Sequence, residues 1–488
     1  MIAAAPNELP TPYLRIGSER LYTASGGTFR HASPYDSTLQ TDVPMAGPAE
    51  IQAAVAAAAG AADDWRFWRP EARRAALHRL ASLIREHREE FGRLSAIDNG
   101  MPLAMGLGGV DLTAEWHDYY AGWCDKIDGQ MLSSFGTRGS FSYTSPEPYA
   151  VVGVILTWNG PLVSLGMSVA APLAAGCTVV VKPSEMTPHS ARLYGELASQ
   201  AGIPDGVLNI VSGGPDAGDA LVRHPLVEKI SFVGGPTTAQ KILVACAERF
   251  KPSLMELGGK SACLVFPDAD DIDSIAQRAA FAAFGKMSGQ ACAIPTRLVV
   301  HEDLHDDVVK RVCEIAAGYT LGDPLDPATR MGPVIHAGAQ QRILESVDRA
   351  VQDGAGRVVL GGTNPGGDLA DKPFVRPTVL VDVDPQHDIA QTEVFGPVLL
   401  VFRFREEDEA IALANGTDYG LAAYIESRDV DRVHRVAERL KAGGVYVNGA
   451  TTIVPHTPYG GLGISGFGKQ GARTGLDEFL RYKTVSIL

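Results

Sequence analysis

The chain has 488 residues, of which 45% are hydrophobic, 20% are charged and 7% are aromatic. At about 150 residues per domain, this length predicts roughly three domains, and the composition excludes a disordered, collagenous or coiled-coil chain. The 57 Asp and Glu residues outnumber the 43 Lys and Arg residues, which gives a net charge of −14. Because such a surface repels phosphate backbones and anionic lipid, we expect neither a nucleic acid nor a membrane as a partner.

Short motifs exclude several other kinds of site. The six cysteines form no CxxC pair, so they predict neither a disulfide framework nor a zinc ribbon, but a reducing compartment. There is no HExxH motif and the twelve histidines lack ligand spacing, so we expect no metal site. The first ten residues lack the basic start and long apolar run of a signal peptide, and the expected location is therefore the cytoplasm.

Residues 150–181 contain no charged side chain, and this run of 32 residues is long enough to span a membrane. Asn159, Gly160 and Pro161 interrupt it with a turn, so it predicts a strand at 151–156, a helix at 162–175 and a strand at 178–181 instead. The alternation continues with strands at 207–211, 229–233 and 254–257 and helices at 190–200, 216–223 and 237–249. This pattern is typical of a parallel, doubly wound sheet.

A second α/β unit is predicted from about residue 260. Strands at 262–266 and 297–300 alternate there with helices at 272–284 and 304–317. Before residue 100 the chain is mostly helical, and we expect these helices to cover one face of the first sheet. Segments 140–143 and 482–488 are predicted to be isolated β segments.

Several glycine-rich strings resemble phosphate-binding loops. Residues 461–466 and 466–471 both satisfy GxGxxG, but neither follows a strand of a βαβ unit, so neither predicts a dinucleotide site. Gly259-Lys260-Ser261 ends like a P-loop without its first glycine, which disfavours an NTPase. Residues 232–237 follow an apolar strand and open a helix, where free N–H groups can bind a pyrophosphate; alternatively, the two glycines only form a turn.

Two residues have the chemistry of a catalytic pair. Glu256 follows a buried apolar run, where a carboxylate is costly, so it is either functional or engaged in a buried hydrogen bond or salt bridge. Cys292 follows a glycine-rich loop that can expose its sulfur, although a cysteine is also common as a small buried apolar residue.

Both residues belong to seven strings that occur in the order found in the aldehyde dehydrogenase superfamily, which the chain resembles from about Tyr13 to Leu488. The strings are Thr157-Trp158-Asn159, Lys182-Pro183-Ser184-Glu185, Phe232-Val233-Gly234-Gly235, Glu256-Leu257-Gly258-Gly259-Lys260, Gly289-Gln290-Ala291-Cys292, Glu393-Val394-Phe395-Gly396-Pro397 and Pro458-Tyr459-Gly460-Gly461 through Gly466. The resemblance implies an α/β fold with a Rossmann-like NAD-binding domain, an α/β catalytic domain and a small β oligomerisation domain. We assign residues 1–130, 150–258 and 463–474 to the first, 259–462 to the second, and 131–149 and 475–488 to the third. A homo-oligomer, either a dimer or a homotetramer, is also implied.

The same resemblance assigns the chemistry. Cys292 would attack the aldehyde carbon to give a thiohemiacetal and then a thioester, Asn159 would hold the oxyanion, and Glu256 would activate the water that releases the carboxylic acid. The cofactor-binding residues would be Thr157, Trp158, Lys182, Ser184, Glu185, Gly214, Gly218, Phe232, Gly234, Gly235, Leu257, Gly258, Glu393 and Phe395. Because a carboxylate at Glu185 accepts bonds from ribose hydroxyls and repels a 2′-phosphate, NAD is favoured over NADP.

The resemblance also predicts a substrate pocket, and a few residues of the chain differ from the family pattern. The pocket would be lined by Gly160, Val163, Met167, Ala291, Ile294 and Ile453. This set holds no Arg or Lys, which favours an uncharged, largely apolar aldehyde. Ser168 and Gln470 stand where the family often has Lys and Glu, so we expect a neutral contact in place of an ion pair. Gly235 stands where Ser is usual, which leaves the contacts to the cofactor phosphate less defined.

Two other functions fit the same fold. One is transfer of the acyl group to coenzyme A, against which Glu256 argues. The other is a noncatalytic structural or binding role, against which the complete set of Cys292, Glu256 and Asn159 argues.

Overall fold

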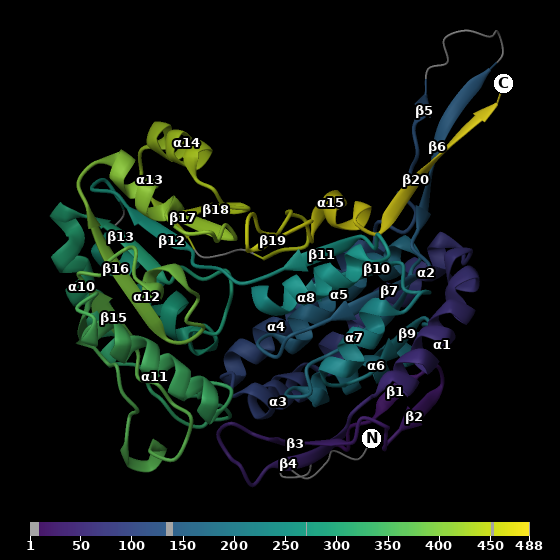
Figure 1. Ribbon diagram of the computed structural model, residues 1–488, viewed down its shortest axis with the longest axis horizontal. Coiled ribbons are helices and arrows are strands. Elements are labelled where there is room, and N and C mark those ends of the chain that lie inside the picture. Colours follow the sequence, from purple (N-terminus) through teal and green to yellow (C-terminus); the bar gives the residue numbers. More distant parts are fainter. Residues whose placement is uncertain (1–8, 133–139, 270, 450–452, 488) are drawn as a thin grey trace.

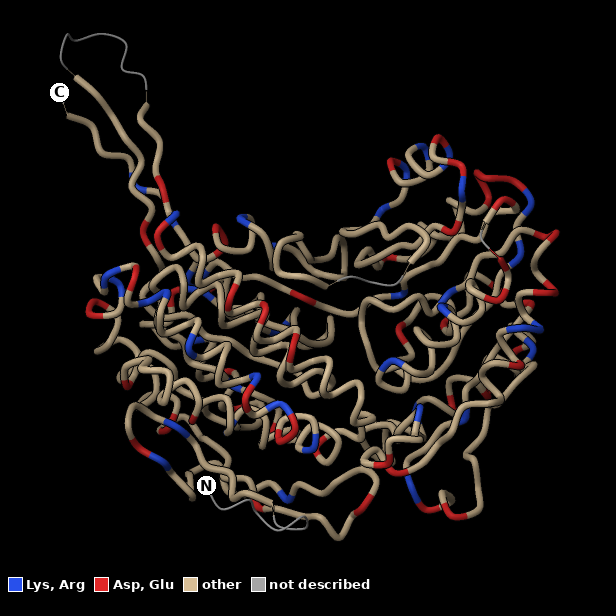
Figure 2. The backbone as a smooth tube through the Cα atoms, turned by 180° about the vertical axis from the view of Figure 1, so that it is seen from behind, with Lys and Arg blue, Asp and Glu red and all other residues tan. Residues whose placement is uncertain are grey.

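The computed structural model describes residues 9–132, 140–269, 271–449 and 453–487. Two α/β bodies lie side by side, each built around one sheet, and a narrow β arm projects from one of them (Figure 1). Figure 2 shows Lys and Arg residues interspersed with Asp and Glu residues along the backbone. Among the described residues, no helix combines the length and apolar character needed to cross a membrane.

The first sheet has eight strands in the order β19-β11-β10-β7-β8-β9-β1-β2. Their bounds are β1 Leu14–Ile16, β2 Glu19–Leu21, β7 Val151–Ile155, β8 Thr178–Lys182, β9 Leu208–Ile210, β10 Lys229–Val233, β11 Ser253–Glu256 and β19 Gly466–Phe467. Strands β7 to β11 run parallel to their neighbours in this group, which confirms the predicted doubly wound sheet. Every residue of β7 and β8 is buried, because helices cover both faces and β-branched side chains fill both layers.

Successive residues of β7 point into different helix layers. Val151 packs with helices α1, α7 and α8, whereas Val152 packs with helices α2 to α6. The helix bounds are α1 Pro48–Arg66, α2 Pro70–Glu86, α3 Arg88–Asn99, α4 Leu103–Ala121, α5 Pro161–Ala175, α6 Pro188–Gln200, α7 Pro215–Arg223 and α8 Pro236–Ala247. The expectation that all helices before residue 100 share one face is therefore wrong, since α1 lies on the face opposite α2 and α3. Hydrophobic periodicity identifies the buried side of each helix but not the face of the sheet that it meets.

The second sheet has seven strands in the order β14-β15-β16-β13-β12-β17-β18. All its pairs are parallel except β14 with β15. The strand bounds are β12 Ala262–Val265, β13 Arg297–His301, β14 Arg357–Leu360, β15 Thr378–Val381, β16 Val398–Phe404, β17 Ala422–Glu426 and β18 Gly444–Val447. The helix bounds are α9 Ile272–Ala280, α10 Glu302–Ala317, α11 Ala337–Gln352, α12 Asp388–Gln391, α13 Glu407–Asn415 and α14 Val430–Arg439, with a short η3 at Gly367–Leu369. The chain passes from one sheet to the other through residues 257–261, between β11 and β12.

The helix expected over 272–284 changes its geometry before it ends. Helix α9 stops at Ala280, and a π-helical turn η1, Phe281–Gly285, and a 3₁₀ turn η2, Met287–Gly289, follow it. Because π-helical turns often occur at functional sites, this change of geometry indicates that the segment just before Cys292 belongs to one.

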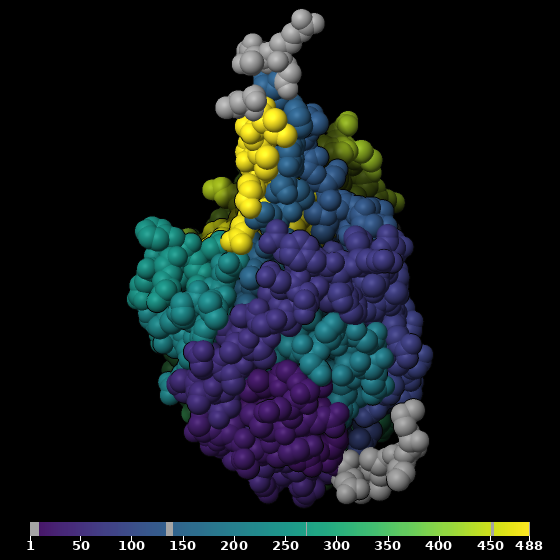
Figure 3. Space-filling view, turned by 90° about the vertical axis from the view of Figure 1, so that its right-hand side faces the viewer, coloured from purple at the N-terminus to yellow at the C-terminus, as the bar shows by residue number. Residues whose placement is uncertain are grey.

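The arm consists of β5 Met131–Leu132, β6 Phe141–Pro148 and β20 Leu480–Ile487, in the order β20-β6-β5. Strand β6 pairs with β20 along its whole length in antiparallel register, from Leu480 opposite Pro148 to Ile487 opposite Phe141. The two segments predicted as isolated are therefore partners, which a local pattern could not show because most of the chain lies between them. Met131, Phe141 and Tyr482 are exposed on the arm, which stands clear of the main body in Figure 3.

The other small elements are the hairpin of β3 Thr28–Ala32 with β4 Gln40–Pro44 and the short helix α15 Ala472–Asp477.

Gly466 is required where β19 meets β11. Its φ is +109°, and an added Cβ would lie 1.9 Å from the carbonyl oxygen of Met255. We expect Gly466→Ala to lower the free energy of unfolding by at least about 2 kcal/mol, because it adds both backbone strain and a clash. The matched control is Gly60→Ala, in the middle of α1 with no atom near the added carbon, which should instead stabilise the protein by about 0.5–1 kcal/mol. Urea denaturation measures both changes, and equal stability of the two variants would contradict this description of the β11–β19 contact.

Candidate active site

A cavity of about 300 Å³ lies beyond the carboxyl ends of β7, β10 and β11, where the first sheet faces the loop that carries Cys292. This is the edge at which ligands bind in open parallel sheets. The three residues expected to be catalytic, Asn159, Glu256 and Cys292, all line it. The other expected site residues in its wall are Thr157, Trp158, Gly234, Gly235, Leu257, Gly258, Glu393 and Phe395 from the cofactor set and Gly160, Val163, Met167, Ala291, Ile294 and Ile453 from the substrate set.

A second group of expected cofactor residues lies outside this cavity, around the ends of the neighbouring strands. Lys182 ends β8, and its Nζ lies 4.0 Å from Glu185 Oε2 and donates to the carbonyl oxygens of Pro183 and Gly213. Gly214 caps α7, and a carbon added to Gly218 would lie 3.7 Å from Lys182 Cε.

Two expected cofactor residues have local contacts within the protein. Ser184 accepts a hydrogen bond from the backbone N–H of Met186. Phe232 is buried in β10, and its ring packs against Gly234 in the loop that follows this strand. Phe232 is not among the residues that line the cavity.

Cys292 is held by close backbone packing. Gly259 lies so near that an added Cβ would meet the carbonyl oxygen of Cys292 at 2.2 Å. The preceding turn contains Ser288 and Gly289 with positive φ, and Ser288 is fixed by a hydrogen bond from its hydroxyl to the carbonyl oxygen of Gly332. The thiol is half-buried and its Sγ lies 3.5 Å from the hydroxyl of Tyr459.

The environment of Cys292 disfavours a thiolate at rest. Burial raises the pKa of the thiol to about 11, and the charges of Glu393 and Glu256 raise it further, while the hydrogen bond with Tyr459 and the charge of Lys286 lower it. At neutral pH the sulfur is therefore a neutral thiol.

Asn159 sits at the turn between β7 and α5. Its Nδ2 donates to the carbonyl oxygen of Gln290 at 2.9 Å, which ties it to the loop of Cys292. Asn99 fixes the turn from behind, because its Nδ2 donates to the carbonyl oxygens of Trp158 and Asn159 at 3.0 and 3.2 Å. The side chain of Asn159 is thus tied to the loop of Cys292 and its backbone to Asn99, and Asn159 and Cys292 line the same cavity.

The carboxyl groups of Glu256 and Glu393 are both buried. Glu256 is 4% exposed, and among the described residues neither of its oxygens has a hydrogen-bond partner. Burial raises its pKa well above the usual value, although Lys469 opposes the shift. Burial also raises the pKa of Glu393 to about 7, and Glu393 accepts a hydrogen bond from the N–H of Gly259 at 3.0 Å. The resting cavity therefore favours protonated carboxyl groups.

The neutral contact expected in place of an ion pair is present. Gln470 Nε2 donates to Ser168 Oγ at 3.0 Å, and both residues are buried in the cavity wall. This confirms the interpretation of the paired loss of charge.

Sequence reasoning missed three polar residues of the wall, Lys286, Tyr459 and Ser164. Tyr459 lies in one of the seven motifs but was given no role. Lys286 is the only charged residue between Arg278 and Arg297. A lone charge in so apolar a stretch was the signal that could have identified it.

Three buried residues far from one another in the sequence also meet. His31 from β3, Asp98 from α3 and His189 from α6 have potential ligand atoms within 4.8 Å of one another. His189 Nδ1 lies 2.6 Å from Asp98 Oδ1, and His31 Nε2 lies 3.3 Å from the same atom. The two histidines hold the pKa of Asp98 at about 2 despite its burial. The spacing argument against metal sites did not anticipate this cluster, because its members come from three elements.

Comparisons with known proteins agree with the geometry. The model of the aldehyde dehydrogenase family matches residues 22–485, and the chain belongs to this family. A betaine aldehyde dehydrogenase from Beta vulgaris is 36% identical over 462 residues, which are 93% of this chain and 92% of that protein. The NAD⁺ complex of an aldehyde dehydrogenase from Bacillus cereus superposes with a TM-score of 0.94 at 35% identity, covering 98% of this chain and 96% of the other. An NADP-dependent enzyme from Escherichia coli superposes with a TM-score of 0.93 at 33% identity, covering 98% of each chain.

The hydrogen bond between Tyr459 and Cys292 can be tested through the reactivity of the thiol. Replacing Tyr459 by Phe removes a contact that lowers the pKa of Cys292, so the pKa should rise above about 11. We expect alkylation of Cys292 by iodoacetamide at pH 9 to slow by about 3- to 10-fold, as for the loss of one hydrogen bond. Peptide mapping separates Cys292 from the other half-buried thiol, Cys313. Tyr446→Phe is the control, because Tyr446 is near Cys292 without donating to it; faster alkylation in Tyr459→Phe would contradict the assignment.

Proposed function

We propose that this chain oxidises an aldehyde to a carboxylic acid with NAD, through a thioester on Cys292. The observation that carries the proposal is that one cavity brings together a thiol, an amide donor and a buried carboxyl group, from Cys292, Asn159 and Glu256. The overall reaction consumes an aldehyde, water and an oxidised dinucleotide and yields the acid, the reduced dinucleotide and a proton.

The covalent step is addition of sulfur to the carbonyl carbon. Glu256, in its ionised form, takes the proton of Cys292 as Sγ bonds to the aldehyde carbon, and the carbonyl oxygen becomes the oxyanion of a thiohemiacetal. Asn159 Nδ2, with the backbone N–H of Cys292, supplies the donors for that oxyanion. Fixed donors in a site away from water stabilise such a charge by about 3 kcal/mol each. The hydrogen bond from Asn159 to Gln290 shows that the amide already faces the loop of the nucleophile.

The residues expected to hold NAD form a site that fits a dinucleotide. Gly235 caps α8 with open space around it, so the helix N-terminus is accessible to a pyrophosphate. Lys182 and Glu185 offer a cation and a carboxylate to the hydroxyls of the adenine ribose. Glu393 and Phe395 lie in the cavity wall, where they can contact the nicotinamide ribose and ring. When bound, the dinucleotide supplies the hydride acceptor.

Hydrolysis of the thioester falls to Glu256. A carboxyl group with a raised pKa is a stronger base once it has lost its proton, and it can take a proton from the attacking water. Because the group is protonated at low pH, this step should speed up as pH rises. Glu256 lies in the same cavity wall as Cys292, where it can activate water. This supports release of a free acid over transfer of the acyl group to coenzyme A.

The substrate pocket supports an aldehyde with a largely apolar body. All six residues expected there line the cavity, and they are apolar or glycine. The further expectation of an uncharged substrate assumed that no Lys or Arg lines the pocket. That assumption is wrong, because Lys286 is part of the wall.

The remaining assignments are proposed on the same basis. We propose that residues 1–130, 150–258 and 463–474 bind the dinucleotide, that 259–462 carry the nucleophile, and that the arm from 131–149 and 475–488 pairs copies of the chain into a dimer or tetramer. The exposed apolar residues of the arm, and the outer edges of β5 and β20 that pair with no other described strand, support the last point. A cytoplasmic enzyme with a small-molecule substrate and no nucleic-acid or membrane partner is proposed from its composition.

The covalent mechanism predicts different defects for two variants. Cys292→Ala should form no NADH while still binding NAD, since only the nucleophile is lost. Glu256→Gln should release one equivalent of NADH, then turn over about 10²- to 10³-fold more slowly, with the added mass of the acyl group on the protein. Stopped-flow absorbance and intact-mass spectrometry measure these outcomes, and Cys313→Ala on α10 is the control that should keep the full rate. A normal steady-state rate in either site variant would contradict its role.

The choice of cofactor depends on Glu185. We expect the enzyme to prefer NAD, and Glu185→Gln to raise the ratio of kcat/KM for NADP over NAD by about tenfold, because a repulsive charge beside the 2′-phosphate is removed. Glu90→Gln, an exposed change on α3, should leave the ratio unchanged. A wild-type preference for NADP would overturn this assignment without affecting that of Cys292.

A further inference from the structure

Lys286 brings a positive charge to the wall of the active-site cavity at a fixed position. It lies between the π-helical turn η1 and the 3₁₀ turn η2. Its backbone N–H donates to the carbonyl oxygen of Phe281 at 2.8 Å, and its own carbonyl oxygen accepts from the N–H of Gly289 at 3.1 Å. These bonds fix the Cα of Lys286 six residues before Cys292.

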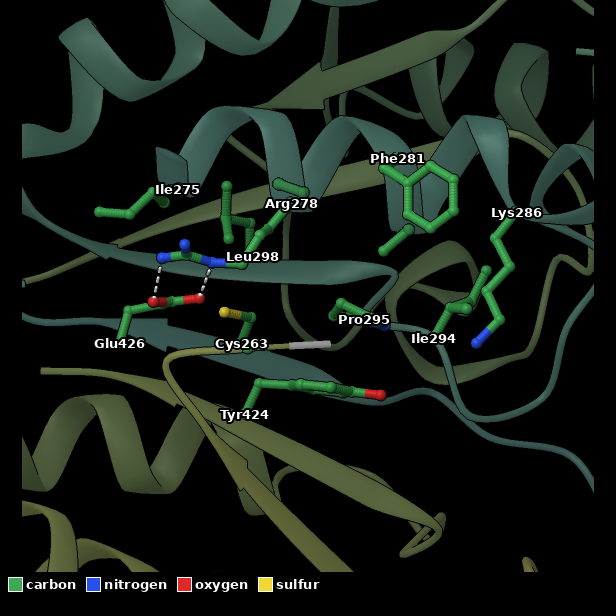
Figure 4. A pocket seen from close by; sticks show the side chains of 13 residues that line it. Cys263, Ile275, Arg278, Phe281, Lys286, Ile294, Pro295, Leu298, Tyr424 and Glu426 are labelled. Carbon is green, nitrogen blue, oxygen red and sulfur yellow. Dashed lines mark hydrogen bonds and ion pairs between the residues drawn. The ribbon is translucent and has the colours of Figure 1, made fainter. Parts of the chain in front are cut away.

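The acidic groups around Lys286 already have other partners. Glu426 forms a bidentate pair with Arg278, at 3.0 and 2.6 Å. Figure 4 shows this pair at one end of a small neighbouring cavity of about 40 Å³, while Lys286 extends past Ile294 at the other end. Lys286 and Ile294 line both cavities. The side chain of Lys286 therefore belongs to the partition between them and is not drawn toward Glu426.

The ammonium group of Lys286 is left without a counter-ion. Across the described part of the chain, no hydrogen bond or ion pair reaches its Nζ, and Cys292 is the one group whose charge favours its protonated form. Glu393 accepts a hydrogen bond from the N–H of Gly259, and the cation whose charge acts on Glu256 is Lys469. Burial lowers the pKa of Lys286, because removing the charged ammonium from water costs free energy. A ligand that brings a negative charge would relieve this cost.

The other residues of the nearby wall indicate which further chemical groups such a ligand would carry. Val163, Ile294 and Ile453 offer apolar surface to a carbon chain, and Cys292 receives the aldehyde carbon in the proposed reaction. Among the described residues of the wall, Lys286 is the one basic side chain. A matching substrate has an aldehyde at one end, an apolar chain and an anionic group at the other end.

We propose that Lys286 binds a carboxylate of the substrate, so that the preferred aldehydes are semialdehydes of dicarboxylic acids. This inference rests on the proposed function and names its substrate class. The same charge repels cationic aldehydes. Betaine aldehyde, which the name of the relative from Beta vulgaris specifies, is a cation, and this chain should therefore discriminate against it.

Three aldehydes of matched length test the proposal, namely 5-oxopentanoate, pentanal and 4-(trimethylammonio)butanal, each assayed with NAD. The wild-type enzyme should show at least a tenfold higher kcat/KM for the anion than for pentanal, and a lower value for the cation. Lys286→Met should reduce kcat/KM for the anion by about 10- to 100-fold, as for loss of a charge-assisted hydrogen bond, and change that for pentanal by less than about threefold. Lys286→Arg should keep the preference for the anion. Lys310→Met, an exposed change on α10, is the matched control and should alter no ratio.

Four other outcomes bear on the role of Lys286 or on the proposed function. A wild-type preference for pentanal, or an unchanged preference in Lys286→Met, would overturn the proposal. An equal loss on the anion and on pentanal, with alkylation of Cys292 shifted to higher pH, would also overturn it and assign Lys286 to the thiol. Absence of NADH formation from all three aldehydes would count against the proposed function itself. Oxidation of pentanal by Lys286→Met shows that the variant is folded and separates the two questions.

Discussion

The removal of ionisable groups from water around Cys292 is the constraint on which the chemistry of this protein depends. The same desolvation raises the pKa of the thiol to about 11 and that of Glu393 to about 7, and it raises the pKa of Glu256 well above its usual value. It acts in the opposite sense on Lys286, because an ammonium loses its charge when the pKa falls. Burial therefore disfavours the charged form of each group, and a partner of suitable charge or a hydrogen-bond donor offsets that cost. In such a site a single fixed donor or counter-ion has a large effect on the reaction.

The fold creates this environment by bringing two sheets together at one cavity. The first sheet contributes Asn159 and Glu256 at the carboxyl ends of β7 and β11. Cys292 comes from the loop before β13 of the second sheet. Gly259 lets the two segments approach closely, since its missing side chain leaves room for the carbonyl oxygen of Cys292. Asn99 holds the turn that carries Asn159 through hydrogen bonds to the carbonyl oxygens of Trp158 and Asn159.

The local sequence predicts much of this architecture. Runs of Val and Ile in β7 and β8 identify strands buried on both faces, and the turn of Asn159 to Pro161 separates β7 from α5. Motifs with a fixed order predict which residues meet at the cavity, and the thiol, the amide and the carboxyl group do so.

Other features depend on contacts that no local pattern contains. The pairing of β6 with β20 is one, and the placement of α1 opposite α2 is another. The cluster of His31, Asp98 and His189 joins three elements, so no spacing within one segment reveals it. Lys286 was visible as a lone charge, but only the structure shows that it lies in the wall of the cavity and that no described acidic residue pairs with it.

The central claim is that the carbon of the aldehyde becomes bonded to the sulfur of Cys292 during each turnover. The most direct test mixes the wild-type enzyme with NAD and an aldehyde labelled with ¹³C at the carbonyl carbon, stops the reaction in acid after milliseconds, and maps the label by tandem mass spectrometry of the digested protein. We expect the labelled acyl group on the peptide that contains Cys292, and we expect it to disappear as the substrate is exhausted. A label on another residue, or product formed with no labelled peptide at any time, would contradict it.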